Sequence, residues 1–119
     1  MSDSEQNEQV INWPAALEGA ANDKDLLDEL VTLFLDESQK NLSDIRKALD
    51  EGNAELLKRA AHTLKGSLRI FQSFKAQDLA FQLEKKGENN SMESADSLLA
   101  QLLDQMKLVR AELEKGYHD

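Results

Sequence analysis

The chain has 119 residues, no cysteine, few aromatic residues and a single proline. This length suits one domain, and the lack of cysteine excludes a disulfide framework, a cysteine metal site and a thiol nucleophile. The net charge of −9 argues against nucleic acid or an anionic membrane as the main partner. Helix-forming residues dominate while glycine and proline are scarce, so the composition predicts an all-α fold.

The two ends of the chain are polar. We expect residues 1–10 to form a flexible N-terminal tail and residues 11–115 to form the folded domain. The start lacks the apolar segment of a secretory signal, and no apolar run is long enough to span a bilayer, so we predict a cytoplasmic protein without membrane contact. The initial methionine and the polar C-terminal tail favour a free-standing protein. His118, in that charged tail, is not expected to take part in function.

Two helices are predicted in the first half of the chain. Pro14 suits the first turn of a short helix that ends near Gly19 or Ala20, with Trp13 anchoring it to the main body. A polar cluster at residues 22–25 then starts a long helix over about 23–51. Its apolar stripe follows alternating steps of four and three residues: Leu27, Val31, Phe34, Ser38, Leu42, Ile45 and Leu49. Because a polar serine interrupts this apolar stripe, the sequence does not decide whether the helix bends near Ser38.

The third helix is predicted to carry the functional residues. Gly52 is a helix stop and Asn53 a cap, which places this helix over about 54–72. On a wheel of about 100° per residue, its buried stripe gathers within about 40° of one direction. The residues of this stripe are Leu57, Ala61, Leu64, Leu68 and Phe71. Ile70 falls on the outer side, where it is either a partner contact or, as we favour, half-covered by the next helix.

Two further helices complete the chain. After a turn near Gln72 and Ser73, a fourth helix is predicted to end at Gly87, with an apolar stripe of Ala76, Leu79, Ala80 and Leu83. A last helix over about 92–115 follows a polar loop. Its expected buried residues are Ala95, Leu98 or Leu99, Leu102, Met106, Val109 and Leu113. Amphipathic helices with short connections predict an antiparallel four-helix bundle with a short additional N-terminal helix.

Two residues of the third helix, His62 and Gly66, face away from its buried stripe, at about 140° and 180° on the wheel. A solvent-facing glycine inside a helix costs roughly 1 kcal/mol relative to alanine, so we expect the bare backbone to admit a partner close to His62. This helix also has four basic residues against Glu55 alone, in a chain whose net charge is −9. Such a basic face is either ordinary solvated surface or an anion-handling patch, and its coincidence with His62 favours the patch.

The third helix resembles the signature of histidine-containing phosphotransfer (Hpt) domains. The resemblance rests on the consecutive residues Arg59, Ala60, Ala61, His62, Thr63, Leu64, Lys65, Gly66 and Ser67. Ile11–Leu17 is similar to the opening helix of those domains, and Leu33–Ser38 to their first long helix. Further matches follow the histidine at the usual offsets, at Leu79, Ala80, Leu83 and Glu84. The resemblance covers most of the chain.

The resemblance implies that His62 accepts a phosphoryl group from the phospho-aspartate of a receiver domain and passes it to another receiver domain. It implies a phosphoryl carrier in two-component signalling, not an enzyme. Lys65 would stabilise the phosphoryl group, and Gly66 would allow the close approach of the partner. The partner-binding residues would be Lys58, Arg59, Ser67 and Arg69. The receiver domain would bring Mg²⁺, so no cofactor or metal is expected on this chain.

The chain departs from the family pattern just after the motif. The family commonly has small or polar residues there and a glycine in the following turn, whereas this chain has Leu68, Arg69, Ile70 and Gln72. We expect Leu68 in the core, and Gln72 leaves the geometry of the turn open. Thr63 and Ser67 are expected at the helix surface or half-buried, and their help in orienting His62 is also left open.

The phosphotransfer hypothesis has two rivals. A receiver-binding helical adaptor without phosphotransfer would keep these features but make His62 dispensable. A coiled-coil-like dimerisation bundle is disfavoured by the short loops. No glycine-rich phosphate loop is present for ATP, and no paired carboxylates suggest acid–base catalysis or a metal site. The expected partners are response regulator receiver domains or a hybrid sensor histidine kinase, bound by a monomer.

Overall fold

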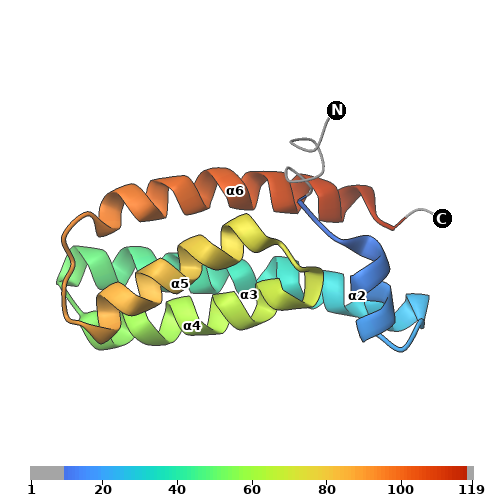
Figure 1. Ribbon diagram of the computed structural model, residues 1–119, viewed down its shortest axis with the longest axis horizontal. Helices are drawn as coiled ribbons and strands as arrows, with labels where there is room; N and C mark the ends of the chain where they lie inside the picture. Colours follow the sequence, from blue (N-terminus) through green and yellow to red (C-terminus); the bar gives the residue numbers. More distant parts are fainter. Residues whose placement is uncertain (1–9, 118–119) are drawn as a thin grey trace.

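The computed structural model describes residues 10–117, which form a bundle of four long helices and one short helix (Figure 1). The helices are α2 (Trp13–Gly19), α3 (Lys24–Glu51), α4 (Ala54–Phe71), α5 (Phe74–Glu88) and α6 (Ala95–Lys115). This is the predicted antiparallel four-helix bundle with an additional N-terminal helix. None of the helices in this range is long and apolar enough to cross a membrane. Residues 1–9 of the expected tail and His118 lie outside the described residues, and Val10 packs against the core.

The first three helices begin at side-chain caps. Asn12, Asp23 and Asn53 each accept a hydrogen bond, at 3.0–3.1 Å, from a backbone N–H of the first turn that follows. These bonds satisfy amide groups that have no partner inside the helix. Gly52 ends α3 in the left-handed conformation with φ 65°, as its position in the sequence predicts. Helix α3 continues without a break through Ser38, whose side chain is buried.

The core is built around α4, which packs against α3 on one side and α5 on the other. The predicted stripe of α4 is fully buried, from Leu57 to Phe71. Helix α5 in turn packs against α6, and among the four long helices α3 and α6 form the loosest pair of neighbours. Helix α2 closes the end of the bundle that holds the turn between α4 and α5 (Figure 1). The backbone N–H of Asn12 donates to the Phe71 carbonyl at 2.9 Å, and the Trp13 ring meets the Phe71 ring edge-on, so Trp13 is the predicted anchor.

Two predicted helix boundaries were wrong. Helix α5 ends at Glu88, and Gly87 is a buried residue inside it rather than its stop. A β-carbon at Gly87 would lie 2.6 Å from the backbone nitrogen of Lys58, so this glycine allows α4 and α5 to approach closely. Helix α6 begins at Ala95 rather than near residue 92, because Ser94 has the left-handed φ of 66° and cannot belong to an α-helix.

The turn between α4 and α5 is made without glycine. Gln72 ends α4 in the left-handed conformation, with φ 51° and ψ 46°. Its backbone N–H donates to the Arg69 carbonyl at 3.1 Å, which satisfies one of the last carbonyls of the helix. The chain therefore keeps the tight turn that the sequence left open, at the cost of placing a side chain in a conformation that favours glycine.

Candidate functional site

The imidazole of His62 stands on the outer face of α4. Its neighbours in sequence explain this position, because Ala61 and Leu64 are buried in the core and the two residues between them, His62 and Thr63, therefore face solvent. The His62 side chain is 66% exposed, as the helical wheel predicted. A molecule that approaches α4 from outside the bundle therefore has direct access to the ring.

Glu84 of α5 holds the imidazole through one ring nitrogen. Its Oε2 lies 2.9 Å from Nδ1 of His62. A carboxylate only accepts hydrogen bonds, so this contact assigns the proton to Nδ1. Within residues 10–117, no hydrogen bond engages Nε2 of the same ring. The neutral ring therefore presents the Nε2 lone pair to solvent, which is the arrangement a nucleophilic nitrogen needs.

Lys65 binds the other oxygen of the same carboxylate. Its Nζ lies 2.8 Å from Oε1 of Glu84 and 4.9 Å from the centre of the Phe81 ring. The Lys65 and Glu84 side chains are each 17% exposed, so this ion pair is shielded more than an ordinary surface pair. Burial alone raises the pKa of Glu84, but hydrogen bonds and charge from Lys65 and then His62 outweigh it and lower the pKa below the usual 4.5.

Gly66 leaves an opening beside His62, one helical turn further along α4. It is exposed, and a β-carbon placed on it would meet nothing within 4 Å. Ile70, a further turn along, is 40% exposed, and Phe81 of α5 is 42% exposed. We call the surface formed by His62, Lys65, Gly66, Ile70 and Phe81 the His62 face. It combines an accessible nitrogen, a cation and apolar area, with bare backbone at its middle.

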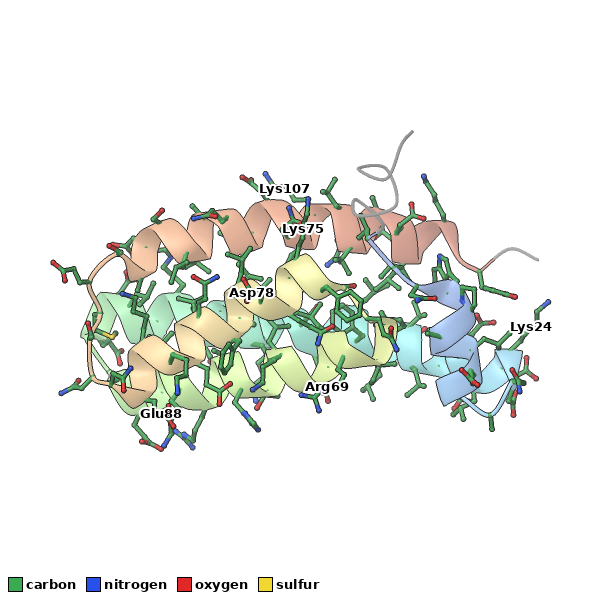
Figure 2. The ribbon with its side chains drawn as sticks, in the orientation of Figure 1. Lys24, Arg69, Lys75, Asp78, Glu88 and Lys107 are labelled. Atoms are coloured by element: carbon green, nitrogen blue, oxygen red, sulfur yellow. The ribbon has the colours of Figure 1, made fainter. Side chains whose placement is uncertain are left out.

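The other residues predicted to bind a partner lie on α4 with different surroundings. Lys58 and Arg59 both pair with Glu55, at 3.7 and 4.0 Å, in exposed contacts that contribute little to stability. Ser67 donates a hydrogen bond of 3.2 Å to the Thr63 carbonyl of the same helix. Arg69 is exposed on the outer edge of α4 (Figure 2) and makes no ion pair with the residues that the structure describes.

The contact that orients His62 comes from Glu84, a residue that the sequence analysis did not consider for this role. The sequence leaves open whether Thr63 and Ser67 help to orient the ring, and the structure shows that the Ser67 hydroxyl bonds to the backbone of α4 itself. Glu84 makes the contact, and the sequence contained a signal for it. In an antiparallel pair of helices, residues at equal distances from the turn face each other, and His62 and Glu84 are evenly spaced about Ser73. Lys65 and Phe81 obey the same register.

A groove between α3 and α4 adjoins the His62 face. Its volume is about 640 Å³, and it is lined by Asp36, Glu37, Lys40, Asn41, Asp44, Leu56, Arg59, Ala60 and Thr63. The carboxylates here do not form a metal site: among residues 10–117, no group of three or more histidine or acidic side chains is placed to hold a metal ion. The groove extends the surface that a partner of the His62 face can contact.

Comparison with known proteins agrees with this geometry. No curated protein sequence matches the chain significantly. Among solved structures, the fold is similar to the crystal structure of histidine-containing phosphotransfer protein B (HptB) from Pseudomonas aeruginosa PAO1. The TM-score is 0.84 and the identity 19%, over 91% of this chain and 94% of that one, so this likeness shows a shared fold. The family model of the Hpt domain matches residues 29–112, and the chain therefore belongs to the Hpt domain family.

Proposed function

We propose that this chain carries a phosphoryl group on His62 between receiver domains. Hpt domains act in phosphorelays as phosphoryl carriers and not as catalytic enzymes. The observation that carries the assignment to His62 is its ring geometry. The ring is exposed, its Nδ1 is held by Glu84, and its Nε2 faces solvent. No other histidine is present within residues 10–117.

The chemistry that this site supports is in-line displacement at phosphorus. The Nε2 lone pair attacks the phosphorus of a receiver phospho-aspartate, and the bond between phosphorus and the aspartyl oxygen breaks. Phosphoryl transfer depends mainly on positioning and on charge stabilisation. Lys65 has three N–H donors, and its pair with Glu84 uses one of them, so the ammonium retains donors for the phosphoryl oxygens.

The His62 face suits a receiver domain as the partner. Gly66 lets the edge of the receiver's active site approach the helix, while Ile70 and Phe81 offer apolar contact area. Lys58, Arg59 and Arg69 provide positive charge toward the acidic pocket that holds the phospho-aspartate. The receiver brings the Mg²⁺ and most of the reacting groups. A cytoplasmic location and a monomeric state, both expected from the sequence, stay predictions.

Transfer of radioactive phosphate tests this proposal. A receiver domain phosphorylated on its aspartate is mixed with the wild-type chain or with a His62→Gln variant, which keeps the size and polarity of the side chain. We expect acid-labile, base-stable label on the wild-type chain and none on the variant, with unchanged circular dichroism. Equal labelling of both proteins would refute His62 as the acceptor. Tight receiver binding by both proteins with label on neither would favour the adaptor without phosphotransfer.

A further inference from the structure

The carboxylate of Glu84 is shared between the proposed nucleophile and the proposed phosphate-binding cation. One oxygen lies 2.9 Å from Nδ1 of His62, and the other lies 2.8 Å from Nζ of Lys65. Each oxygen therefore faces its own nitrogen, one in a hydrogen bond with the imidazole and the other in an ion pair with the ammonium. A neutral amide could also accept a hydrogen bond from Nδ1, but it would not form the ion pair with Lys65, so the negative charge at this position does more than orient the ring.

Other charged groups surround His62 but do not contact its ring. On α4 these are Lys58 and Arg59, which pair with Glu55, and on α5 they are Lys85 and Glu88, which pair with each other at 2.8 Å. From α3, charged groups line the groove beyond Thr63: Asp36, Glu37, Lys40 and Asp44. Within residues 10–117, Glu84 is the carboxylate in direct contact with the imidazole.

We propose that the negative charge of Glu84 keeps Nδ1 protonated while His62 carries the phosphoryl group, so that the group can leave without a separate proton transfer. This inference rests on the proposed function and assigns a further positioning role in the same reaction. The electrostatic basis is general: an adjacent negative charge favours the cationic form of an imidazole.

The proton and electron balance shows why this matters. When Nε2 attacks phosphorus, its lone pair forms the new bond, and the ring becomes a cation that still carries the Nδ1 proton. In the onward step, a receiver aspartate oxygen attacks phosphorus, and the electron pair of the phosphorus–nitrogen bond returns to Nε2. The ring then leaves as neutral imidazole with the Nδ1 proton in place. If that proton were lost, the leaving group would be an imidazolate anion, which is a much poorer leaving group.

The charge of Glu84 therefore extends the pH range over which phosphate can be passed on. With a carboxylate beside Nδ1, the phosphorylated ring keeps its proton as the pH rises through neutrality. With an amide in its place, the ring is still held by a hydrogen bond but loses its proton at lower pH. A purely orienting role would produce no such difference, because the acceptor oxygen is present in both cases.

A Glu84→Gln variant tests the inference. Both proteins are loaded with phosphoramidate, a small phosphoryl donor, so that loading does not require a receiver. The rate of transfer to one receiver domain is then measured between about pH 6 and pH 9. Dividing the rate of the variant by the rate of the wild type at each pH removes the receiver's own pH dependence. We expect the ratio to approach one at the acid end and to fall to about one tenth at the alkaline end.

Glu88→Gln is the matched control, because it removes a carboxylate one turn away on α5 that pairs with Lys85 and not with His62. The transfer rate of Glu88→Gln, divided by that of the wild type, should stay near one over the whole pH range. A Glu84→Gln ratio that is constant over the pH range would overturn the inference, and so would a variant that cannot be loaded at any pH. In either case a wild-type chain that is labelled on His62 leaves the proposed function intact. Loss of labelling in the wild type itself would instead refute the proposed function.

Discussion

The imidazole of His62 is widely exposed and is anchored through only one of its nitrogens. Glu84 fixes that nitrogen from the neighbouring helix, and Lys65 fixes Glu84 in turn. The three side chains form a chain of contacts from α4 to α5 and back. Each contact constrains a side chain that would otherwise rotate freely in solvent. The accessible Nε2 is therefore presented in a defined direction, which shortens the search for an in-line approach.

The same contacts make stability depend on the charge of Glu84. Its pKa is lower in the folded chain than the usual 4.5, so its contribution is present above that pH and is lost as the pH falls through the folded pKa. We expect the wild type to be more stable than Glu84→Gln by about 1 kcal/mol at pH 7. Urea denaturation at pH 7 and at about pH 3 measures this, and the difference should shrink at the lower pH. An undiminished difference at low pH would contradict the role of the carboxylate charge.

At the scale of the helices, two glycines on the α4–α5 hairpin have opposite surroundings. Gly66 faces open space, whereas a β-carbon at Gly87 would lie 2.6 Å from the Lys58 nitrogen and 2.7 Å from the Ala54 carbonyl oxygen. Both lie inside helices, Gly66 as the sequence predicts and Gly87 against the prediction of a helix stop. Packing requires the glycine at position 87. Nothing within the described part of the chain requires it at position 66, and this open space is what the proposed close approach of a partner needs.

Alanine substitutions separate these two roles. Gly66→Ala should stabilise the fold by about 0.5–1 kcal/mol, because alanine is the better helix former and meets no neighbour. Gly87→Ala should destabilise it by about 1–3 kcal/mol, because backbone must move to admit the methyl group. Thermal unfolding gives both values.

Gly66→Leu should keep the fold and lose phosphate transfer, because its side chain would fill the opening beside His62. Normal transfer in that variant would refute the close-approach role of Gly66.

The turn between α4 and α5 stores a small amount of strain at Gln72. A side chain in the left-handed region costs about 1–2 kcal/mol relative to glycine, and the greater freedom of glycine in the unfolded chain offsets part of the gain. We therefore expect Gln72→Gly to raise the free energy of unfolding by about 0.5 kcal/mol. Gln72→Ala is the control and should give no such gain, because alanine has the same β-carbon. A loss of stability in Gln72→Gly would show that the Gln72 side chain itself supports the turn.

Sequence patterns predicted the helices well and the contacts between them less well. The stripe on α4 and the caps at Asn53 and Gly52 follow from periodicity and local preferences, which neighbouring residues carry on their own. The sequence predicts a helix stop at Gly87, because its contact with Lys58 exists only once two helices pack. The contact of Glu84 with His62 escapes the pattern of a single helix for the same reason. His62, Lys65 and Gly66 can be proposed from the sequence because they lie on one helix, within two turns.

At the scale of the whole molecule, an acidic protein presents a basic edge beside its proposed site. The net charge is −9, yet α4 carries Lys58, Arg59, Lys65 and Arg69 against one acidic residue. Figure 2 shows Arg69 on the α4 edge of the bundle and Lys107 on α6 at the opposite edge. Such an asymmetric distribution orients an approaching acidic partner toward the His62 face, and it repels acidic surfaces elsewhere.

Salt should therefore slow phosphate transfer by weakening this attraction. Raising the ionic strength from about 0.05 M to about 0.5 M shortens the screening length severalfold, and we expect the second-order transfer rate to fall about tenfold. Arg69→Gln should lower the rate at low salt and flatten its dependence on salt. Lys107→Gln, the same charge change on the opposite edge, should leave both unchanged. Equal effects of the two substitutions would show that net charge alone governs the encounter.

The central claim concerns one atom, and the most direct measurement locates the phosphoryl group on it. The wild-type chain, made with ¹⁵N-labelled histidine, is phosphorylated by a receiver domain, and phosphorus–nitrogen coupling is recorded by NMR. The geometry predicts a single phosphohistidine, bonded through Nε2 of His62, with the Nδ1 proton retained. Attachment to Nδ1, to another residue or to no residue of this chain would contradict the account.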